Sequence, residues 1–225
     1  ATAYPIAQQL NQLNIERRQV EGAMKQQALS ALQHIQLETE HLPAALVMFD
    51  EQWHQGVIGI VAGRLKEQFH RPSLVFAPDE DGIHIKGSAR SIEGIHIRDT
   101  IEQVAEQYPH LVSHFGGHAA AAGLTLNKAH FEEFRQIFTQ YIAEMDQELF
   151  QATLWTDGIL PDMAVSLSTL DQIEQLGPWG QKFPLPQFEG SFKVIDYRWL
   201  KDQHLKLKLA LGQQVVDAIA FNAAG

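Results

Sequence analysis

The segment 115–123, Phe-Gly-Gly-His-Ala-Ala-Ala-Ala-Gly, joins two adjacent glycines to a histidine and a run of small residues. Gly116 and Gly117 predict a turn without side chains, whose backbone can take a positive φ and can be approached closely by a partner. His118 adds a group that donates, accepts or carries charge near neutral pH. The segment therefore predicts a cradle for an anion or a nucleotide; the alternative is a glycine turn that enters an alanine-lined core.

Ser88 and Arg90 form a second polar pair, in the alternating segment 83–90 that predicts a half-buried strand. Residues two apart on a strand point to the same face. A guanidinium fork beside a hydroxyl suits a phosphate, whereas an exposed arginine beside a surface serine is the alternative. If this strand and the glycine turn are neighbours in one sheet, the pair and the glycine–histidine segment form a single phosphate pocket.

His54 precedes the segment 55–62, whose small and apolar residues predict a tight junction from a strand into a helix. Helix N-termini present free N–H groups that attract anions, so His54 is a candidate for holding a phosphate there. The alternative is a histidine that caps the helix or packs at the junction.

Three histidines, His110, His114 and His118, recur at a four-residue spacing that would place them on one face of a helix. Pro109 and the two glycines interrupt a helix there, and no nearby acidic residue completes a set of metal ligands. The chain has no cysteine, which excludes disulfides and thiolate metal sites. We therefore expect no metal to be bound by these residues.

The net charge of −10 by itself disfavours a nucleic-acid partner, because proteins that bind nucleic acids are usually basic. Positive charge is nevertheless concentrated in two stretches, 84–98 and 198–208. The second stretch includes Arg198, Lys206 and Lys208. Solvated strand faces are the alternative explanation for both stretches.

The elements that must position these residues change in kind along the 225-residue chain. Apolar residues at helical spacing predict one long helix over 5–38, followed by alternating strands and helices. We expect an α/β domain whose mixed or mostly parallel sheet is flanked by helices, and beyond residue 150 a small β-barrel or part of one. The expected strands span 45–49, 73–77, 83–90, 123–126, 154–160, 190–200, 204–211 and 215–221, and the later helices span 56–70, 97–107 and 127–149.

These motifs, in this order, resemble the RecJ single-stranded-DNA exonucleases of the DHH superfamily, and the resemblance covers nearly the whole chain. It implies a connecting helix over 1–40 that leaves an absent catalytic DHH domain, a DHH-associated substrate-binding domain over 41–149, and a truncated oligonucleotide-binding (OB) fold over 150–225. The abrupt chain ends, with no initiator Met, predict a piece of a longer protein. The matching stretches are 13–18, 53–62, 87–91, 115–123, 177–180 with Pro184, Pro186 and Phe188, and 204–207.

The function implied by the resemblance is 5′-to-3′ hydrolysis of single-stranded DNA in repair and recombination. The Mn²⁺ or Mg²⁺ ions would be held by the absent domain and by no residue of this fragment, which alone should lack nuclease activity. Ser88 and Arg90 match residues that engage the 5′-phosphate end. His118 and its glycines match the loop that faces the scissile region, where the imidazole could assist.

The barrel implied by the resemblance would guide the incoming strand. Candidates for its groove are Arg198, Trp199, Lys206 and Lys208, and bases could stack on Tyr197, Trp199 or Phe192.

The implied partners are single-stranded DNA and helper proteins of DNA repair, such as a single-strand-binding protein or a helicase. We expect a cytoplasmic monomer with no membrane segment, because no apolar run approaches ~20 residues. Two other functions stay open. One is a DHH-superfamily phosphoesterase that acts on a small nucleotide such as a dinucleotide, and the other is a protein-interaction module.

Overall fold

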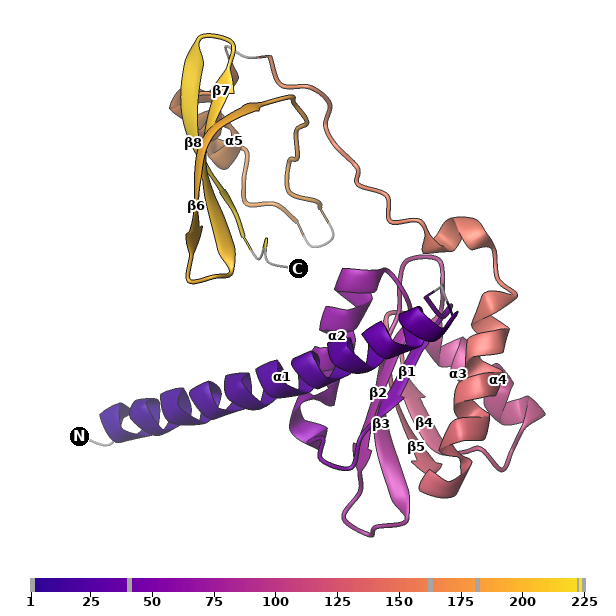
Figure 1. Cartoon of the computed structure of the whole chain (residues 1–225). Coiled ribbons are helices and arrows are strands. Elements are labelled where there is room, and N and C mark those ends of the chain that lie inside the picture. Colours follow the sequence, from indigo (N-terminus) through magenta and orange to yellow (C-terminus); the bar gives the residue numbers. More distant parts are fainter. Residues whose placement is uncertain (1–2, 40–41, 162–163, 181–182, 222, 224–225) are drawn as a thin grey trace. The chain divides into compact units, whose positions relative to one another are not determined.

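The computed structural model describes residues 3–39, 42–161, 164–180, 183–221 and 223. The chain divides into two compact units, Ala1–Ala152 and Thr153–Gly225. In chain order (Figure 1) the first unit contains α1 (Ala3–Thr39), β1 (Leu46–Phe49), α2 (Gln55–Phe69), β2 (Ser73–Pro78), β3 (His84–Arg90), α3 (Ile97–Gln107), β4 (Val112–Gly117), β5 (Ala121–Asn127), η1 (Lys128–His130), α4 (Phe131–Ala143) and η2 (Gln147–Phe150).

The first unit is built on a five-stranded sheet with the strand order β1-β2-β3-β5-β4. β1 runs parallel to β2, and the other neighbouring strands pair antiparallel. Helices α1 and α2 lie on one side of the sheet, and α3 and α4 lie on the other (Figure 1). This arrangement confirms the predicted α/β class with a mixed sheet flanked by helices.

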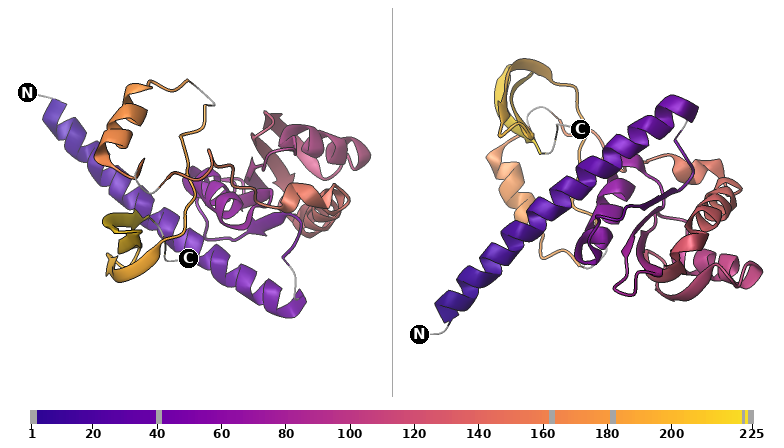
Figure 2. Two further views of the ribbon diagram at one scale, coloured as in Figure 1. Left: turned by 90° about the horizontal axis from the view of Figure 1, so that it is seen from above. Right: turned by 60° about the horizontal axis from the view of Figure 1, so that its bottom comes forward.

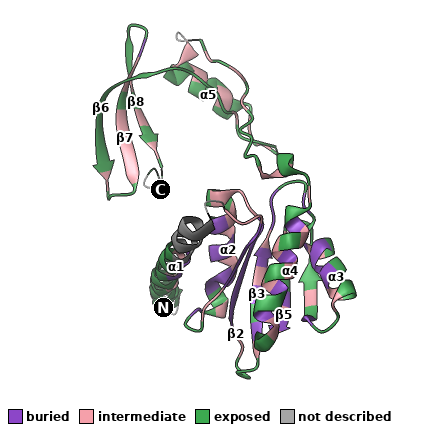
Figure 3. Ribbon diagram, turned by 45° about the vertical axis from the view of Figure 1, so that its right-hand side comes forward, coloured by how far each residue is buried: buried purple, intermediate pink, exposed green. Residues whose placement is uncertain are grey.

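The two faces of β2 are both covered, which explains why its sequence is apolar at nearly every position. Leu74 and Phe76 belong to the core under α3 and α4, whereas Val75 and Ala77 belong to the core under α2. β3 differs, because buried residues alternate along it with partly or fully exposed ones. The burial colouring of Figure 3 shows the buried residues gathered in this unit. The covering on the α2 side therefore ends near β3.

Among the side chains that the structure describes, α1 packs on α2 from the middle of the helix onward. Met24 and Ala28 are buried in the core shared with α2, and Trp53 Nε1 donates to Gln27 Oε1 at 2.8 Å. The helix extends well beyond the sheet as a single rod (Figure 2). The large apolar residues of the extended part are exposed, among them Tyr4, Ile6, Leu10 and Leu13.

The single helix predicted over 127–149 is wrong in its extent, because two capping side chains divide the segment. Asn127 Oδ1 accepts from the backbone N–H of Ala129 at 2.9 Å and begins the short helix η1. Asp146 Oδ1 accepts from the N–H of Glu148 at 3.0 Å and begins η2. Such local bonds compete with continuous α-helix, so α4 occupies only the middle of the segment.

The described residues of the second unit form a three-stranded antiparallel meander and the α-helix α5, which agrees with a partial OB fold. A turn over 201–203 joins β6 to β7, as predicted, and Lys201 and Asp202 there have φ values of 52° and 50°. Two successive positive φ values suit the tight hairpins that match strand twist. The elements are α5 (Leu167–Gln175), β6 (Lys193–Leu200), β7 (His204–Leu211) and β8 (Gln214–Ala220).

Two differences from the predicted elements lie in this unit. The strand predicted over 154–160 is wrong, since only Ile159 makes an isolated bridge, to Glu189. Helix α5 was not predicted. The signal for it is Ser166, whose Oγ accepts from the N–H of Thr169 at 3.2 Å, followed by apolar residues at helical spacing.

The second unit buries little of its apolar surface. Among its described residues, Leu211 alone is buried. Tyr197 is 64% exposed and Trp199 is 48% exposed, although both lie on the strand face that also carries the leucines of β7.

None of the helices among the described residues has the length and hydropathy needed to cross a bilayer.

Candidate nucleic-acid interface

In the part of the chain that the structure describes, the sheet face on the α2 side is partly covered by α2 over β3 and is open over β5 and β4. α2 and α1 cover β1 and β2 on this face. The residues that β3 and β5 direct to the same face are polar or small, and none of them is buried: His84, Lys86, Ser88, Arg90, Ala121, Gly123, Thr125 and Asn127. An uncovered sheet face of small and polar residues can receive an extended ligand.

The strand register arranges this open face in three short rows. Ser88 pairs with Gly123, which pairs with Gly116 in β4. Because neighbouring strands are about 4.8 Å apart, this glycine row extends about 10 Å from Ser88. The row on one side holds Arg90 and Ala121, and the row on the other side holds Lys86, Thr125 and His114. The register thus brings the predicted hydroxyl–guanidinium pair and Gly116 onto one surface.

Arg90 is the cation at the centre of this site, and its charge is uncompensated. Its Nη1 donates to Ser88 Oγ at 3.0 Å and to the carbonyl of Ala89 at 2.9 Å. None of the ion pairs within the described part of the chain includes Arg90, whereas Arg64 and Arg98 both pair with carboxylates. Because the Ser88 hydroxyl accepts from Arg90, its own proton is available. The pair can therefore donate to an anion from two side chains.

A cavity of about 470 Å³ lies between these side chains and the first two turns of α2. The first turn of α2 contains no acidic residue, unlike those of α3 and α4, so the positive end of its dipole is unopposed. This geometry favours an anion in the cavity. The lining residues are Gln55, Gly56, Ile58, Gly59, Ile60, Lys86, Ser88 and Arg90.

Gly59 allows α2 to approach the polar pair closely. A Cβ at this position would lie 2.9 Å from Arg90 Nη2 and 3.0 Å from Ser88 Oγ. Gly59 was not among the site residues predicted from the sequence. The available signal is that Gly56, Gly59 and Gly63 recur at three- and four-residue spacing, which gives α2 one bare face.

Replacing Gly59 by alanine should weaken binding of a phosphate ligand by about 3–10-fold, because the new methyl group displaces the guanidinium, and 1.4 kcal/mol corresponds to a factor of ten. The protein should not be destabilised, since alanine is favoured over glycine within a helix by about 1 kcal/mol. Titration of phosphorylated oligonucleotide and thermal unfolding measure the two effects. Gly63→Ala is the control, because a Cβ there meets no atom within 4 Å. Equal affinity of both variants would contradict the assigned contact.

The predicted glycine turn is wrong: both glycines belong to strand β4, and the turn follows them at 118–120. Gly117 has φ 145°, and a Cβ there would lie 2.4 Å from the carbonyl oxygen of Ala121. Gly116 has no atom within 4 Å of such a Cβ, and Gly123 has only one, at 3.9 Å. Gly117 is therefore required by the hairpin, whereas Gly116 and Gly123 leave bare backbone open to a ligand.

The turn after the glycines is held against the end of β3 and the start of α3. The N–H of His118 donates to the carbonyl of Ala121 at 2.8 Å, and the N–H groups of Ser91 and Ile97 donate to the carbonyls of Ala120 and Ala119 at 3.0 Å. His118 is exposed. These bonds place its backbone beside Ala121, the register partner of Arg90.

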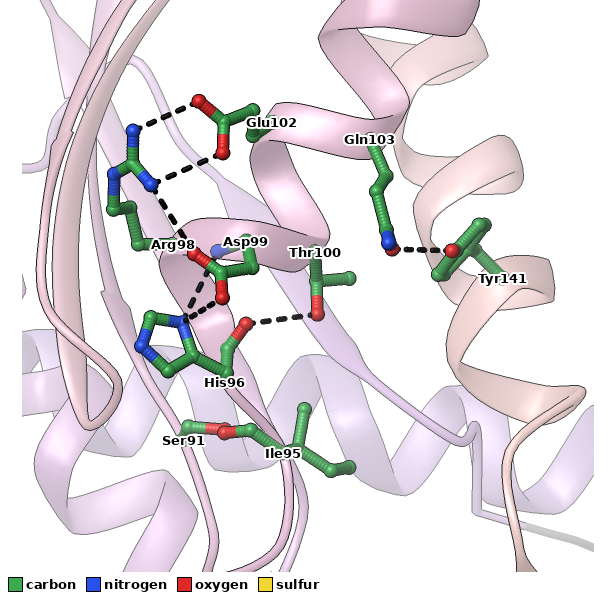
Figure 4. A network of polar contacts seen from close by, with 9 residues as sticks. All are labelled: Ser91, Ile95, His96, Arg98, Asp99, Thr100, Glu102, Gln103 and Tyr141. Atoms are coloured by element: carbon green, nitrogen blue, oxygen red, sulfur yellow. Dashed lines mark hydrogen bonds and ion pairs between the residues drawn. The ribbon is translucent and has the colours of Figure 1, made fainter.

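A polar network at the start of α3 stabilises the residues that hold the turn (Figure 4). Ser91 Oγ donates to the carbonyl of Ile95 at 2.7 Å, and His96 Nδ1 accepts from the N–H of Asp99 at 3.3 Å. Arg98 pairs with Glu102 at 2.8 Å. The network stabilises the segment 91–102, which supplies the Ser91 and Ile97 N–H groups that hold the turn.

His54 and His110 have other partners. His54 Nδ1 accepts from the N–H of Gly56 at 3.0 Å, so the side chain caps α2, and it does not line the cavity. His110 Nε2 lies 3.1 Å from Glu133 Oε1, whereas His114 lies within β4. Across the described residues, no group of three or more His, Asp or Glu side chains could hold a metal ion.

Lys86 lies at the edge of the site and is held by an acid. Its Nζ lies 2.9 Å from Asp79 Oδ1, an oxygen that also accepts from Gln55 Nε2 at 3.2 Å. The hydrogen bond from Lys86 lowers the pKa of Asp79 and raises the pKa of Lys86. The lysine is therefore fully charged at neutral pH.

The second unit separates its charged and aromatic candidates onto opposite strand faces. Arg198 pairs with Lys206 in the register, and Lys208 lies two residues further along the same face. Trp199 pairs with Leu205 and lies on the opposite face, so it is not beside these cations. Asp196 and Asp217 flank Lys208 and reduce the positive charge. Phe192 lies before β6 and is 40% exposed.

Comparison with known proteins gives matches over both units. The DHHA1 domain family matches residues 42–144, and the RecJ OB domain family matches residues 156–225. The "Single-stranded-DNA-specific exonuclease RecJ" of Haemophilus influenzae is 44% identical over 225 residues, which is 98% of this chain and 39% of that protein. The Escherichia coli protein of the same name is 40% identical over 220 residues, 96% of this chain and 38% of its own length.

A solved structure matches the fold. The crystal structure of RecJ in complex with Mg²⁺ from Thermus thermophilus superposes with a TM-score of 0.73 at 27% identity, over 96% of this chain and 32% of that one. The chain spans about two fifths of the length of the curated relatives named above.

Proposed function

Because this chain belongs to the RecJ family, we propose that it is the substrate-binding portion of a 5′-to-3′ single-stranded-DNA-specific exonuclease. The face of β3, β5 and β4 on the α2 side binds the 5′-terminal nucleotide, with the terminal phosphate in the cavity at Ser88 and Arg90. The observation that carries this proposal is the guanidinium of Arg90, which pairs with no carboxylate of the described residues and lies beside the Ser88 hydroxyl, whose proton is available, and a row of bare glycines.

Each part of the site has a distinct task in this proposal. Arg90 and Ser88 donate to the terminal phosphate, with the positive end of α2 behind them. Gly123 and Gly116 form a flat floor on which the sugar and phosphate backbone lies close to the strands. His118 stands beside the Arg90 row, where it can donate to the terminal nucleotide. The chain thus orients the 5′ end for cleavage.

Hydrolysis is assigned to the remainder of the full-length enzyme. A relative carries Mg²⁺ in its solved structure, and another RecJ structure from Thermus thermophilus carries Mn²⁺. The described residues of this chain do not fit such a site, because they contain no cluster of three suitable ligands. The residues of this chain therefore bind and orient the substrate.

The polar face of the second unit supplies further contacts to the DNA backbone. Arg198, Lys206 and Lys208 line a shallow cavity of about 400 Å³ together with Asp196 and Asp217. Each phosphate that these cations contact steepens the dependence of affinity on salt. Trp199 lies with the leucines on the other face, so the proposed contacts of this unit are electrostatic. Repair proteins as partners, a monomeric state and a cytoplasmic location belong to the same proposal.

The proposed function is tested by comparing single-stranded oligonucleotides that differ only in a 5′-phosphate or 5′-hydroxyl end. The chain should bind the phosphorylated strand at least about tenfold more tightly, because hydrogen bonds to a charged group contribute about 1.5–3 kcal/mol each. Affinity should fall steeply between about 50 and 200 mM salt. Equal binding of both ends, or binding restricted to a phosphorylated dinucleotide, would contradict the proposal.

A further inference from the structure

We infer that Lys86 and Thr125 bind the second phosphate of the DNA strand, the one that follows the terminal nucleotide. This inference rests on the proposed function, since it places the terminal phosphate at Ser88 and Arg90. It adds a binding position at the other side of the glycine row.

The position of these residues follows from the register. Lys86 precedes Ser88 by two residues and therefore lies on the same face, about 7 Å along the strand. Thr125 is the register partner of Lys86 and follows Gly123 by two residues. Lys86 and Thr125 are thus neighbours on adjacent strands, on the far side of the glycine floor from Arg90. A nucleotide lying on that floor has one phosphate at each side.

Lys86 retains donors for such a phosphate. The ammonium group has three N–H donors, and the bond to Asp79 uses one of them. The side chain is 49% exposed and lines the same cavity as Ser88 and Arg90. It is therefore charged, accessible and directed into the site.

Asp79 is held without the help of Lys86. Its carboxylate also accepts from Gln55 Nε2 at 3.2 Å and from the N–H of Glu80 at 2.8 Å. Lys86 can therefore turn toward a phosphate without leaving the carboxylate unsatisfied. The same carboxylate repels a phosphate, so Asp79 should oppose binding while Lys86 supports it.

Two substitutions separate a binding role from a purely structural ion pair. Lys86→Met should weaken binding of a 5′-phosphorylated single strand by about 3–10-fold, and Asp79→Asn should strengthen it by about 2–3-fold, by the arithmetic of tenfold per 1.4 kcal/mol. A structural pair predicts that both variants lose affinity together or that neither changes. Thr125→Val, which keeps the side-chain shape, should weaken binding by about 2–3-fold.

A modified oligonucleotide shows which phosphate Lys86 contacts. With an uncharged methylphosphonate at the linkage after the first nucleotide, Lys86→Met should no longer weaken binding. The parent chain has then already lost the contact between Lys86 and the phosphate charge. A penalty that persists with this oligonucleotide overturns the assignment to the second phosphate. Lys128→Met is the matched control, because Lys128 is 45% exposed and also pairs with a carboxylate, that of Glu51. An equal loss in this control would indicate a general charge effect and also overturns the inference.

The two proposals fail in different ways. If the parent chain shows no preference for a 5′-phosphate, the proposed function fails. If that preference is present and the methylphosphonate does not interact with Lys86→Met, only the second-phosphate position is overturned. Thermal unfolding of each variant, compared with the parent chain, shows that any change in affinity is measured on folded protein.

Discussion

Replacing Gly117 by alanine should lower the midpoint of thermal unfolding of the first unit by roughly 6–12 °C, or about 3 kcal/mol. Gly117 has φ 145°, a conformation that is strained for any residue with a Cβ. The new methyl group would also meet backbone, at 2.4 Å from the carbonyl oxygen of Ala121 and 2.5 Å from Cα of Ala122. Backbone atoms in a paired hairpin cannot move aside cheaply, so the β4–β5 pairing must be distorted.

Gly116→Ala is the matched control for this prediction. The two glycines are neighbours in β4, but a Cβ at Gly116 meets nothing within 4 Å. Alanine there should leave the unfolding midpoint unchanged and should weaken binding of single-stranded DNA, because the methyl group rises from the floor of the site. Equal stability of both variants, measured by calorimetry, would contradict the assigned difference between the two glycines.

Replacing Arg90 by alanine should weaken binding of 5′-phosphorylated single-stranded DNA by about 10–100-fold, because charge-assisted hydrogen bonds contribute about 1.5–3 kcal/mol each. Binding of the 5′-hydroxyl strand should change much less, so the preference for the phosphorylated end should largely disappear. Arg90→Lys keeps the charge without the planar fork and should retain part of the preference. Fluorescence anisotropy with the two oligonucleotides measures both quantities.

The control for Arg90 is Arg64→Ala. Arg64 is an exposed arginine of α2 that pairs with Glu21 and Glu67, so its charge is already compensated. This variant should retain the preference for a 5′-phosphate. A similar loss in both variants would indicate that overall positive charge, and not the site at Arg90, determines binding.

Much of the fold could be predicted because local pattern and tertiary structure agree. The helix over 97–107 and the strand over 204–211 have the predicted bounds, because an amphipathic face or a strict alternation is set by neighbouring residues alone. The extent of α4 could not be predicted in the same way. Capping by Asn127 and Asp146 competes with helical spacing, and the apolar pattern continues across both caps.

The candidate site likewise contains residues that the sequence predicted and a residue that it did not. Ser88 and Arg90 were identified because a strand periodicity of two places them on one face. Gly59 was not identified, since its importance depends on an approach between segments far apart in the sequence. A Cβ at Gly59 would meet Arg90, which lies 31 residues later in the chain. This close approach exists only once α2 has packed on the sheet.

By itself, the sequence determined the α/β class, the polar pair and the glycine–histidine segment, because residue type and local spacing specify these features. Only the tertiary structure decided that the two glycines belong to a strand, that they have different physical roles, and that β5 lies between them and Ser88. The reason is that strand order and register arise from long-range hydrogen bonds and from the packing of α2. Those interactions select one surface from several that the same motifs allow.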